Sequence, residues 1–282
     1  MELDNVNYIS ILLPISSTKY LKETFLSIMH QDYDLRKIEI IMVTRKQLVN
    51  EVSSLFSIYL KHHNYKLIEA KKHDIVSALN IGLNKCSFEY VARIDHDDIM
   101  LPNRLYNQVK FLNENKNVSA VGGQLELIDK NGDFIGMAYY PITKCEISMS
   151  HKYINPLAHP AVMFKKSEVL KVGGYQENYP EDWDLWVRLL SKGRIANLPT
   201  PVIQYRVHSE QLSRSELYSN YNALTNMNKR ESVRRTERFV KSQKFEFKLI
   251  YLRALNTFWN FSRLLVCKVL FMKYQWGKRH VR

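Results

Sequence analysis

The sequence predicts an α/β protein whose central sheet is mostly parallel and doubly wound. Short apolar runs with strand character alternate with helical patterns from the start of the chain. This alternation repeats four times within about a hundred residues, which is the pattern of consecutive βα units. The regular alternation then stops, so a mixed half is expected beside the parallel one. In such sheets, ligands collect at the carboxyl ends of the strands.

The first half divides into strands and helices by the spacing of apolar residues. The run Tyr8–Leu13 predicts a buried strand that ends at Pro14, and Leu21, Phe25 and Ile28 recur at helical spacing. Asp74 is placed to cap a later helix through Leu83. Further strands are predicted at residues 38–43, 66–68 and 90–94, and helices at residues 19–30 and 47–60.

The second half predicts strands and loops that add to the first half without forming a separate domain. A helix is expected at residues 103–113, followed by strands at 119–122, 124–128 and 134–139. Residues 130–133, Lys-Asn-Gly-Asp, are a strong hairpin turn signal. A helix starting at Glu181 and a strand at residues 202–207 complete this half.

Composition excludes several protein classes. The chain has 282 residues, 45% hydrophobic and 24% charged, which are globular values. Three widely spaced cysteines exclude a disulfide framework and a CxxC zinc site, so a reducing, cytoplasmic setting is expected. Met1–Asn5 carry no apolar signal region, and no run approaches the roughly 18–20 apolar residues of a membrane span.

The net charge of +13 is concentrated at the end of the chain. Residues 229–282 hold 15 Lys and Arg against three acids, a net of +12, which leaves +1 for residues 1–228. We therefore expect a domain at residues 1–228 and a helical tail at residues 229–282. Its interleaved aromatic residues favour a basic amphipathic helix on an anionic membrane surface. A helix packed on the main domain is the alternative, and nucleic-acid binding is the least favoured.

Nucleotide-binding signatures based on glycine are absent from the sequence. No GxGxxG follows the first strand, and no GxxxxGK[ST] occurs. Dinucleotide binding and P-loop NTP binding are therefore excluded, and a bound nucleotide must be held in another way.

Three carboxylates follow the fourth predicted strand. Asp95, Asp97 and Asp98 would repel one another when ionised, and a hard cation such as Mg²⁺ or Mn²⁺ would relieve this. The EF-hand spacing of glycine and glutamate is absent. The alternative is that Asp98 or Asn103 caps the next helix.

An ordered set of motifs resembles a known family. They are Ile9–Pro14, Leu26–Gln31, Ile38–Ile41, Ala78–Asn80, Tyr90–Asp98 with Pro102 and Arg104–Leu105, His159–Phe164, Gly173–Tyr175, Glu181–Trp186, and Tyr205–His208 with Leu212–Ser213. Together they resemble the family 2 glycosyltransferases, inverting nucleotide-sugar enzymes with the GT-A fold. The bacterial members that build lipopolysaccharide, O-antigen or capsule are the most similar.

The resemblance implies a reaction and a location. The nucleotide sugar would bind to residues 8–118 and the acceptor to residues 119–228. With Mn²⁺ or Mg²⁺, the enzyme would move a hexose or N-acetylhexosamine from a nucleotide diphosphate sugar, with UDP as the expected nucleotide. The acceptor would be a hydroxyl of a glycan or lipid-linked substrate. The protein would lie on the inner face of the cell membrane as a peripheral protein.

The resemblance also implies residue roles. Asp182 corresponds to the catalytic base, with Glu181 beside it; the alternative is that both only complement a helix N-terminus. The implied donor residues are Pro14, Thr44, Asn80, Arg93, Asp95, Asp97, Arg206 and His208. The implied acceptor residues are His159, Trp183 and Trp186, and the implied metal ligands are Asp97, Asp98 and His208. Several alternatives remain open. His159 is a turn residue in one of them, and the two tryptophans belong to the core in another. Asn80 has a structural role in a third, and residues 206–208 form a surface strand in a fourth.

One segment departs from the family pattern. After the second strand the family carries an acidic residue that contacts the nucleoside, whereas this chain has Val43–Lys46. Thr44 would give a weaker hydrogen bond, and Arg45 or Lys46 would contact phosphate. This departure keeps two other hypotheses open: a non-catalytic protein on the same scaffold that binds membranes or nucleic acid, and a nucleotidyltransferase.

Overall fold

The computed structural model describes residues 7–59, 64–70, 72, 74–151, 154–177 and 180–208. The chain divides into two compact units, Met1–Phe134 with Ala138–His208 and Ile135–Met137 with Ser209–Arg282. The site lies in the first unit. The predicted boundary at residue 228 and the basic tail lie outside the described residues, so both stay predictions.

Strands and helices alternate through the first half, as the sequence predicts. Parallel pairing joins β3 to β2, β2 to β1 and β1 to β4. Asp74 caps α3 as expected, since its Oδ1 accepts a hydrogen bond of 2.7 Å from the Ser77 amide. The elements are β1 (Ile9–Ile15), α1 (Leu21–Met29), β2 (Ile38–Thr44), α2 (Val49–Tyr59), β3 (Asn64–Glu69), α3 (Ile75–Lys85) and β4 (Tyr90–Arg93).

The expected end of the first strand at Pro14 is wrong, because β1 continues to Ile15. The Leu12 carbonyl accepts a hydrogen bond from the Ile94 amide, so the backbone N–H and C=O groups of Leu12 point toward β4. Backbone groups alternate sides along a strand, and Pro14 therefore faces the same side two residues later. Pairing with β4 ends at Leu12, so the missing N–H of Pro14 costs no ladder hydrogen bond.

The second half adds strands of both directions to the sheet, in the order β3-β2-β1-β4-β8-β6-β9-β5. β8 is antiparallel to β4 and to β6, while β9 is parallel to β6. Hence β4, β6 and β9 run in one direction and end at the same edge. The elements are β5 (Ile99–Met100), α4 (Arg104–Glu114), β6 (Val118–Ile128), β7 (Phe134–Ala138), α5 (Lys144–Ser150), β8 (Met163–Lys165), α6 (Lys166–Lys171), α7 (Glu181–Lys192) and β9 (Arg194–Arg206).

The two strands expected at 119–122 and 124–128 are one strand, β6, with irregular pairing to β9 near Gly122. A Cβ on Gly122 would lie 2.3 Å from Asn197 Oδ1, and one on Gly123 would lie 2.6 Å from Val202 Cγ1. These glycines make room for the side chains of β9 and do not end the strand. The predicted turn after β6 is present, with the Asp129 amide donating to the Asp133 carbonyl over 2.9 Å.

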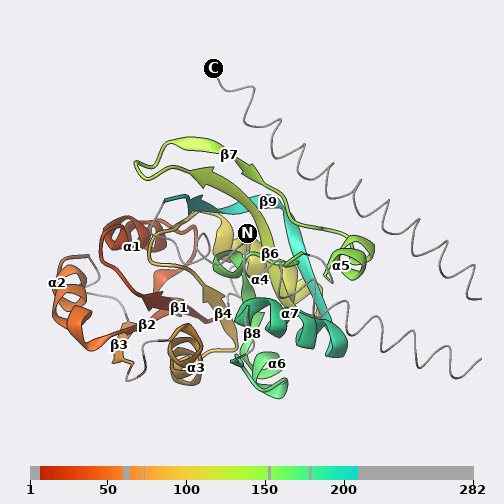
Figure 1. The fold of residues 1–282 in the computed structure, drawn as a ribbon, viewed down its shortest axis with the longest axis horizontal. Helices are drawn as coiled ribbons and strands as arrows, with labels where there is room; N and C mark the ends of the chain where they lie inside the picture. The colour runs from red at the N-terminus through yellow and green to blue at the C-terminus, as the bar shows by residue number, and fades with distance from the viewer. Residues whose placement is uncertain are drawn as a thin grey trace, which may run out of the picture. The chain divides into compact units, whose positions relative to one another are not determined.

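Helices cover both faces of the sheet, which is the doubly wound arrangement. Alternate side chains of β1 enter different cores: Ile11 packs with residues of α1, α2 and α4, whereas Leu12 packs with residues of α3 and α7. Figure 1 shows α1 and α3 on opposite sides of β1. In the part of the chain that the structure describes, no helix has the length and apolar content for a bilayer crossing.

Candidate active site

The three predicted carboxylates lie together directly after β4. Asp95, Asp97 and Asp98 each offer a ligand oxygen, and these atoms lie within 4.8 Å of one another. The last two side chains are buried, and Asp95 is half-buried. Their position at the carboxyl edge of the sheet is where a ligand of such a fold binds.

Asp95 is held by the last residue of β4. The two Nη atoms of Arg93 contact its two carboxylate oxygens at 2.5 and 2.6 Å. This two-pronged geometry fixes the carboxylate in one orientation. Burial raises the pKa of Asp95, the positive charge of Arg93 opposes that rise, and Asp97 adds to it.

Asp98 is fully buried and has one oxygen without a protein partner. Its Oδ1 accepts a 2.9 Å hydrogen bond from the Arg206 amide, whereas Oδ2 has no hydrogen-bond partner. Burial and then the charges of Asp97 and Asp95 raise its pKa well above the usual value. The capping alternative is wrong for this segment, because Asn103 occupies the N-cap of α4 without a side-chain cap bond.

The residues present fit a divalent cation. The unpartnered buried oxygen of Asp98 lies among hard oxygen ligands, which suit Mg²⁺ or Mn²⁺. His208 contacts one member of this group, since its Nε2 lies 2.8 Å from Asp97 Oδ2. Of the three predicted metal ligands, Asp97 and Asp98 thus belong to the cluster, and His208 contacts Asp97 from a position 111 residues later in the chain.

Arg206 is completely buried, which differs from the expected contact with the donor diphosphate. Its Nε donates to the Asp97 carbonyl at 3.0 Å, and its Nη1 donates to the carbonyls of Asp129 and Lys130 at 3.3 and 3.4 Å. Its Nη2 contacts the Glu23 carboxylate, and the guanidinium lies 4.3 Å from the Tyr20 ring centre. The side chain therefore ties the acidic segment to α1 and to the turn after β6. It is not a surface strand residue, as the alternative had it.

Glu181 and Asp182 begin α7 and have different surroundings. Burial, and to a smaller extent the charge of Asp182, raises the pKa of Glu181 to about 7. Burial also raises the pKa of Asp182, but hydrogen bonds oppose that rise. Both pKa values are thus raised by burial, and only that of Asp182 is opposed by hydrogen bonds from neighbouring residues.

One of the hydrogen bonds to Asp182 comes from a residue that sequence reasoning missed. Asn155 Nδ2 donates to Asp182 Oδ2 at 2.7 Å, and the Trp183 amide donates to Oδ1 at 2.7 Å. Both bonds favour the ionised form. Asn155 lies in a loop without hydrophobic periodicity, so no pattern in the sequence could have identified it.

His159 lies behind the carboxylate pair and is buried. Its Nδ1 is 3.8 Å from Glu181 Oε1, and its Nε2 is 3.0 Å from the Tyr175 hydroxyl. Burial, with a contribution from Arg93, holds the pKa of His159 well below the usual value. The imidazole is therefore neutral at physiological pH. A role for it in acceptor binding stays a prediction.

The two tryptophans expected to bind the acceptor have different positions. Trp186 is fully buried and contacts the His159 ring edge-on at 5.8 Å, so it has no face free for a sugar. The core alternative therefore holds for Trp186. Trp183 is half-buried, and its indole Nε1 donates to the His151 carbonyl at 2.8 Å.

Three residues predicted to bind the donor are buried in the sheet or hydrogen-bonded to the protein backbone. Thr44 is buried and its hydroxyl donates to the Ile15 carbonyl at 2.9 Å, while Arg45 is exposed. Pro14 is buried in β1. Asn80 exchanges two hydrogen bonds with the backbone of Tyr175. Donor contact by these residues stays a prediction.

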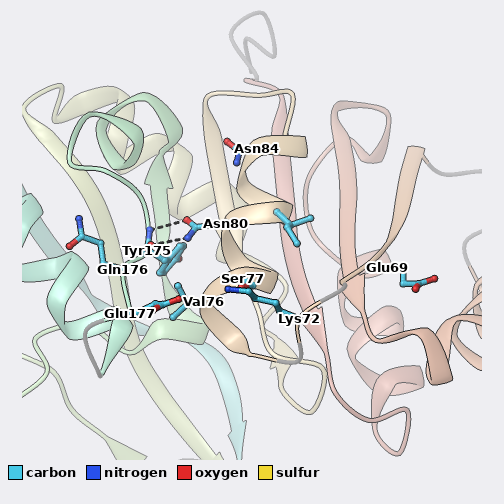
Figure 2. Close-up of a pocket in the computed structure, with 10 residues that line it drawn as sticks. Glu69, Lys72, Val76, Ser77, Asn80, Asn84, Tyr175, Gln176 and Glu177 are labelled. Atoms are coloured by element: carbon cyan, nitrogen blue, oxygen red, sulfur yellow. Dashed lines mark hydrogen bonds between the residues drawn. The ribbon is translucent and has the colours of Figure 1, made fainter.

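A cleft of about 680 Å³ lies between α3 and the segment that follows α6. Figure 2 shows Asn80 and Tyr175 joined by two hydrogen bonds at this cleft, with Lys72 and Glu69 toward β3. The cleft is thus bordered on one side by Tyr175, whose hydroxyl contacts His159.

Arg93 connects the two acidic groups. It is buried, forms the ion pair with Asp95, and its charge lowers the pKa of both Glu181 and Asp182 against the effect of burial. The acidic segment after β4 and the carboxylate pair at α7 therefore both interact electrostatically with the same guanidinium.

Comparisons with known proteins agree with this arrangement. Residues 10–244 match the sequence profile of a family described as "Glycosyltransferase like family 2". The O-antigen biosynthesis glycosyltransferase WbnJ of Escherichia coli is 31% identical over 223 residues, covering 77% of this chain and 86% of that protein. The UDP-Gal:alpha-D-GlcNAc-diphosphoundecaprenol beta-1,3-galactosyltransferase of Escherichia coli is 32% identical over 157 residues. That match covers 55% of this chain and 57% of that protein.

Among solved structures, the mannosyltransferase PcManGT from Pyrobaculum calidifontis, in complex with GDP-Man and Mn²⁺, has a TM-score of 0.59. Its identity is 16%, and the match covers 76% of this chain and 61% of that one. At this identity the likeness concerns the fold, which is the GT-A type that the sequence motifs imply. The profile match and the WbnJ relative extend over most of the chain, and the protein therefore belongs to the family 2 glycosyltransferases, of the type that acts in bacterial surface polysaccharide synthesis.

Proposed function

We propose that the protein is a metal-dependent, inverting glycosyltransferase. It transfers a hexose or N-acetylhexosamine from a UDP-linked donor to a hydroxyl of a glycan or lipid-linked acceptor. The observation that carries this proposal is that Arg93, which forms an ion pair with Asp95 after β4, also interacts electrostatically with the carboxylate pair at α7. A donor diphosphate and an acceptor hydroxyl can then meet at one place.

Asp182 is the general base of the reaction. At neutral pH, burial and the charge of Asp182 favour a proton on Glu181, while Asn155 and the Trp183 amide favour the ionised form of Asp182. Asp182 takes the proton of the acceptor hydroxyl as that oxygen attacks the anomeric carbon. Attack from the face opposite the leaving diphosphate inverts the configuration, so an α-linked donor gives a β-linked product.

Asp97, Asp98 and His208 are the residues that would hold the cation on the donor side. A bound divalent ion supplies Lewis-acid stabilisation of the charge on the leaving nucleoside diphosphate. Arg93 keeps Asp95 in place beside this group through its two contacts. Because most of these side chains are buried, their charges act in a medium that screens them less than water does.

The named relatives support the substrate classes. One relative is named for UDP-Gal, a diphosphoundecaprenol-linked acceptor and a beta-linked product, which match the donor, acceptor and stereochemistry proposed here. The structural neighbour with GDP-Man and Mn²⁺ supports a nucleotide sugar together with a divalent cation. If the acceptor is lipid-linked, the basic residues of 229–282 would bind the cytoplasmic face of the anionic membrane in which the acceptor lies.

The test is a thermal-shift panel of nucleotide sugars on the full chain, with and without Mn²⁺. A single UDP-sugar that raises Tm only with the metal identifies the donor, because a ligand that binds only the folded state stabilises it. Asp97→Ala should remove the metal-dependent shift, and Asp182→Ala should keep it while turnover is lost.

The proposal is wrong if no nucleotide sugar binds or is hydrolysed and Asp97→Ala and Asp182→Ala behave like the wild type. Salt-sensitive binding to anionic vesicles or RNA without metal-dependent nucleotide binding would then favour the non-catalytic alternative. The Thr44 hydroxyl, which is engaged within the sheet, is the observation that keeps this alternative in the test.

A further inference from the structure

Both ends of the Asn80 amide bind one residue of a distant loop. Asn80 Nδ2 donates to the Tyr175 carbonyl at 2.8 Å, and the Tyr175 amide donates to Asn80 Oδ1 at 3.0 Å (Figure 2). These two bonds join the middle of α3 to a segment 95 residues later in the chain. Because both Nδ2 and Oδ1 of Asn80 bind Tyr175, the side chain has fewer hydrogen-bonding positions left for a ligand.

The loop has a backbone shape that brings Tyr175 close to Asn80. Gly173 and Gly174 have φ angles of +91° and +66°, a region that side-chain-bearing residues rarely adopt. A Cβ on Gly174 would lie 2.8 Å from Asn80 Oδ1. The two glycines therefore permit both the turn and the close approach.

The same loop is held from α7 as well. Arg188 donates to the carbonyls of Val172 and Gly174 at 2.6 and 2.8 Å, and its guanidinium forms an ion pair with Asp184 at 2.6 Å. The loop is thus anchored between α3 and the helix that carries Glu181 and Asp182. The backbone around Tyr175 is thus held on both sides, and its ring is buried.

Tyr175 connects the anchored loop to the carboxylate pair through His159. Its hydroxyl lies 3.0 Å from His159 Nε2, and His159 Nδ1 lies 3.8 Å from Glu181 Oε1. Trp186 closes the other side of the imidazole through the edge-on ring contact at 5.8 Å. The contacts form a chain from Asn80 through Tyr175 and His159 to Glu181.

We propose that Asn80 and Tyr175 are positioning residues, which hold His159 against Glu181 and so fix the carboxylate pair relative to the acceptor. This inference rests on the proposed function and assigns Asn80 to the acceptor side of the site, although the sequence places it at the nucleotide. Misplacement of a catalytic group by about 1 Å costs about 10²-fold in rate, so such a chain matters for turnover without touching substrate.

The experiment compares Asn80→Ala, Tyr175→Phe and the double variant in the full chain with Mn²⁺ and the donor identified by the thermal-shift panel. Steady-state kinetics give kcat and the donor KM, and calorimetry gives the donor Kd. Asn84→Ala is the matched control, because Asn84 is an exposed asparagine one turn further along α3.

We expect each single variant to lower kcat by about 10- to 100-fold with an unchanged donor Kd. The double variant should lose little more than the worse single one, because both substitutions interrupt the same chain of contacts. Asn84→Ala should retain the wild-type kcat and Kd.

The inference is overturned if Asn80→Ala raises the donor Kd while kcat is retained, which would make Asn80 a donor contact. It is also overturned if Tyr175→Phe keeps the full kcat, or if the two losses multiply in the double variant. Tyr175→Phe removes a single oxygen and carries the test if Asn80→Ala does not fold. Failure of the proposed function has a separate signature, since the wild type itself would then show no donor binding.

Discussion

At the scale of single residues, the site depends on the difference between two neighbouring carboxyl groups. Glu181 has a pKa raised to about 7 by burial and by Asp182, whereas Asp182 receives hydrogen bonds from Asn155 and the Trp183 amide. In the proposed function, these environments favour a proton on Glu181 and leave Asp182 as the base.

Replacing the base should therefore cost much more than replacing its neighbour. We expect Asp182→Asn to lower kcat by about 10²- to 10⁴-fold, the usual contribution of a positioned base, with donor Kd unchanged. Glu181→Gln resembles the protonated form and should lower kcat by less than about tenfold. Rate measurements at saturating donor and acceptor check this, and equal losses in the two variants would contradict the assignment.

The raised pKa of Glu181 also predicts a pH dependence of stability. A carboxyl group whose pKa is higher in the folded state than in the unfolded state binds more protons when folded. Its contribution is fully present below the unfolded pKa of about 4.3 and is lost as pH rises through about 7. Neutral His159, with its lowered pKa, acts in the opposite direction below about pH 6.5.

The difference between the wild type and Glu181→Gln isolates the Glu181 contribution. We expect the wild type to lose free energy of unfolding relative to the variant as pH rises from about 4.3 to 7, measured by urea unfolding at several pH values. A difference that does not change with pH would contradict the pKa assigned to Glu181.

Sequence reasoning located the acidic residues but not their partners. Asp95, Asp97 and Asp98 follow a visible strand signal, so their place at the sheet edge could be predicted. The burial of Trp186 and the contact of Asn155 with Asp182 depend on how distant segments pack. No local spacing in the sequence carries that information.

At the scale of elements, Arg206 at the end of β9 holds the acidic segment in place through several hydrogen bonds. Arg206 binds the Asp97 carbonyl, the two carbonyls of the turn after β6 and the Glu23 carboxylate of α1. These groups belong to three different parts of the fold. A single planar guanidinium with five N–H donors reaches all of them, which a lysine ammonium cannot do.

Arg206→Lys should therefore destabilise the protein and weaken metal-dependent donor binding. We expect a loss of about 3 kcal/mol in the free energy of unfolding, the typical cost of breaking a buried charged network. Urea unfolding measures it, and Arg194→Lys, at the exposed start of β9, is the matched control with a change within about 0.5 kcal/mol. Normal stability with a raised donor KM would instead support the direct donor contact that the sequence predicted.

Helix α3 packs closely on the sheet at a glycine. A Cβ on Gly82 would lie 2.3 Å from Leu12 Cδ1 and 3.0 Å from Val43 Cγ2. We expect Gly82→Ala to destabilise the protein by about 1–3 kcal/mol through overpacking, despite the better helix propensity of alanine. Urea unfolding beside the exposed Asn84→Ala variant checks this, and a stabilised Gly82→Ala protein would show that the helix can shift at little cost.

At the scale of the whole molecule, charge and chemistry occupy different parts of the chain. Residues 1–228 are nearly neutral overall and contain the acidic site, whereas residues 229–282 hold almost all of the excess positive charge. In the proposed function, the first part performs the transfer and the second attracts the membrane that carries the acceptor.

Substitutions in the basic segment should thus separate membrane binding from donor binding. We expect Arg263→Gln, Lys268→Gln and Lys273→Gln together to weaken binding to vesicles rich in phosphatidylserine by about 100-fold, at about 1 kcal/mol per charge. Donor Kd should not change. Vesicle sedimentation at several salt concentrations measures the effect, with Arg45→Gln and Lys46→Gln as the control pair on the main domain. Equal losses in both sets would contradict a role specific to the tail.

The parallel arrangement of the first strands could be predicted at this scale because each βα unit has a strong pattern. The position of β8 in the sheet could not be predicted. It has three residues, Met163–Lys165, yet it lies antiparallel between β4 and β6 and joins the two halves of the sheet. A strand of that length has no detectable alternation of its own.

The position of Arg206 also has a consequence for biosynthesis. Its amide binds Asp98, which precedes it by 108 residues, so a nascent chain that has only reached α4 lacks the group that fixes the acidic segment. Asp98 cannot make this contact before β9 has been synthesised. In the proposed function, a truncated product that ends at residue 118 would therefore carry the acidic motif without the residue that binds Asp98.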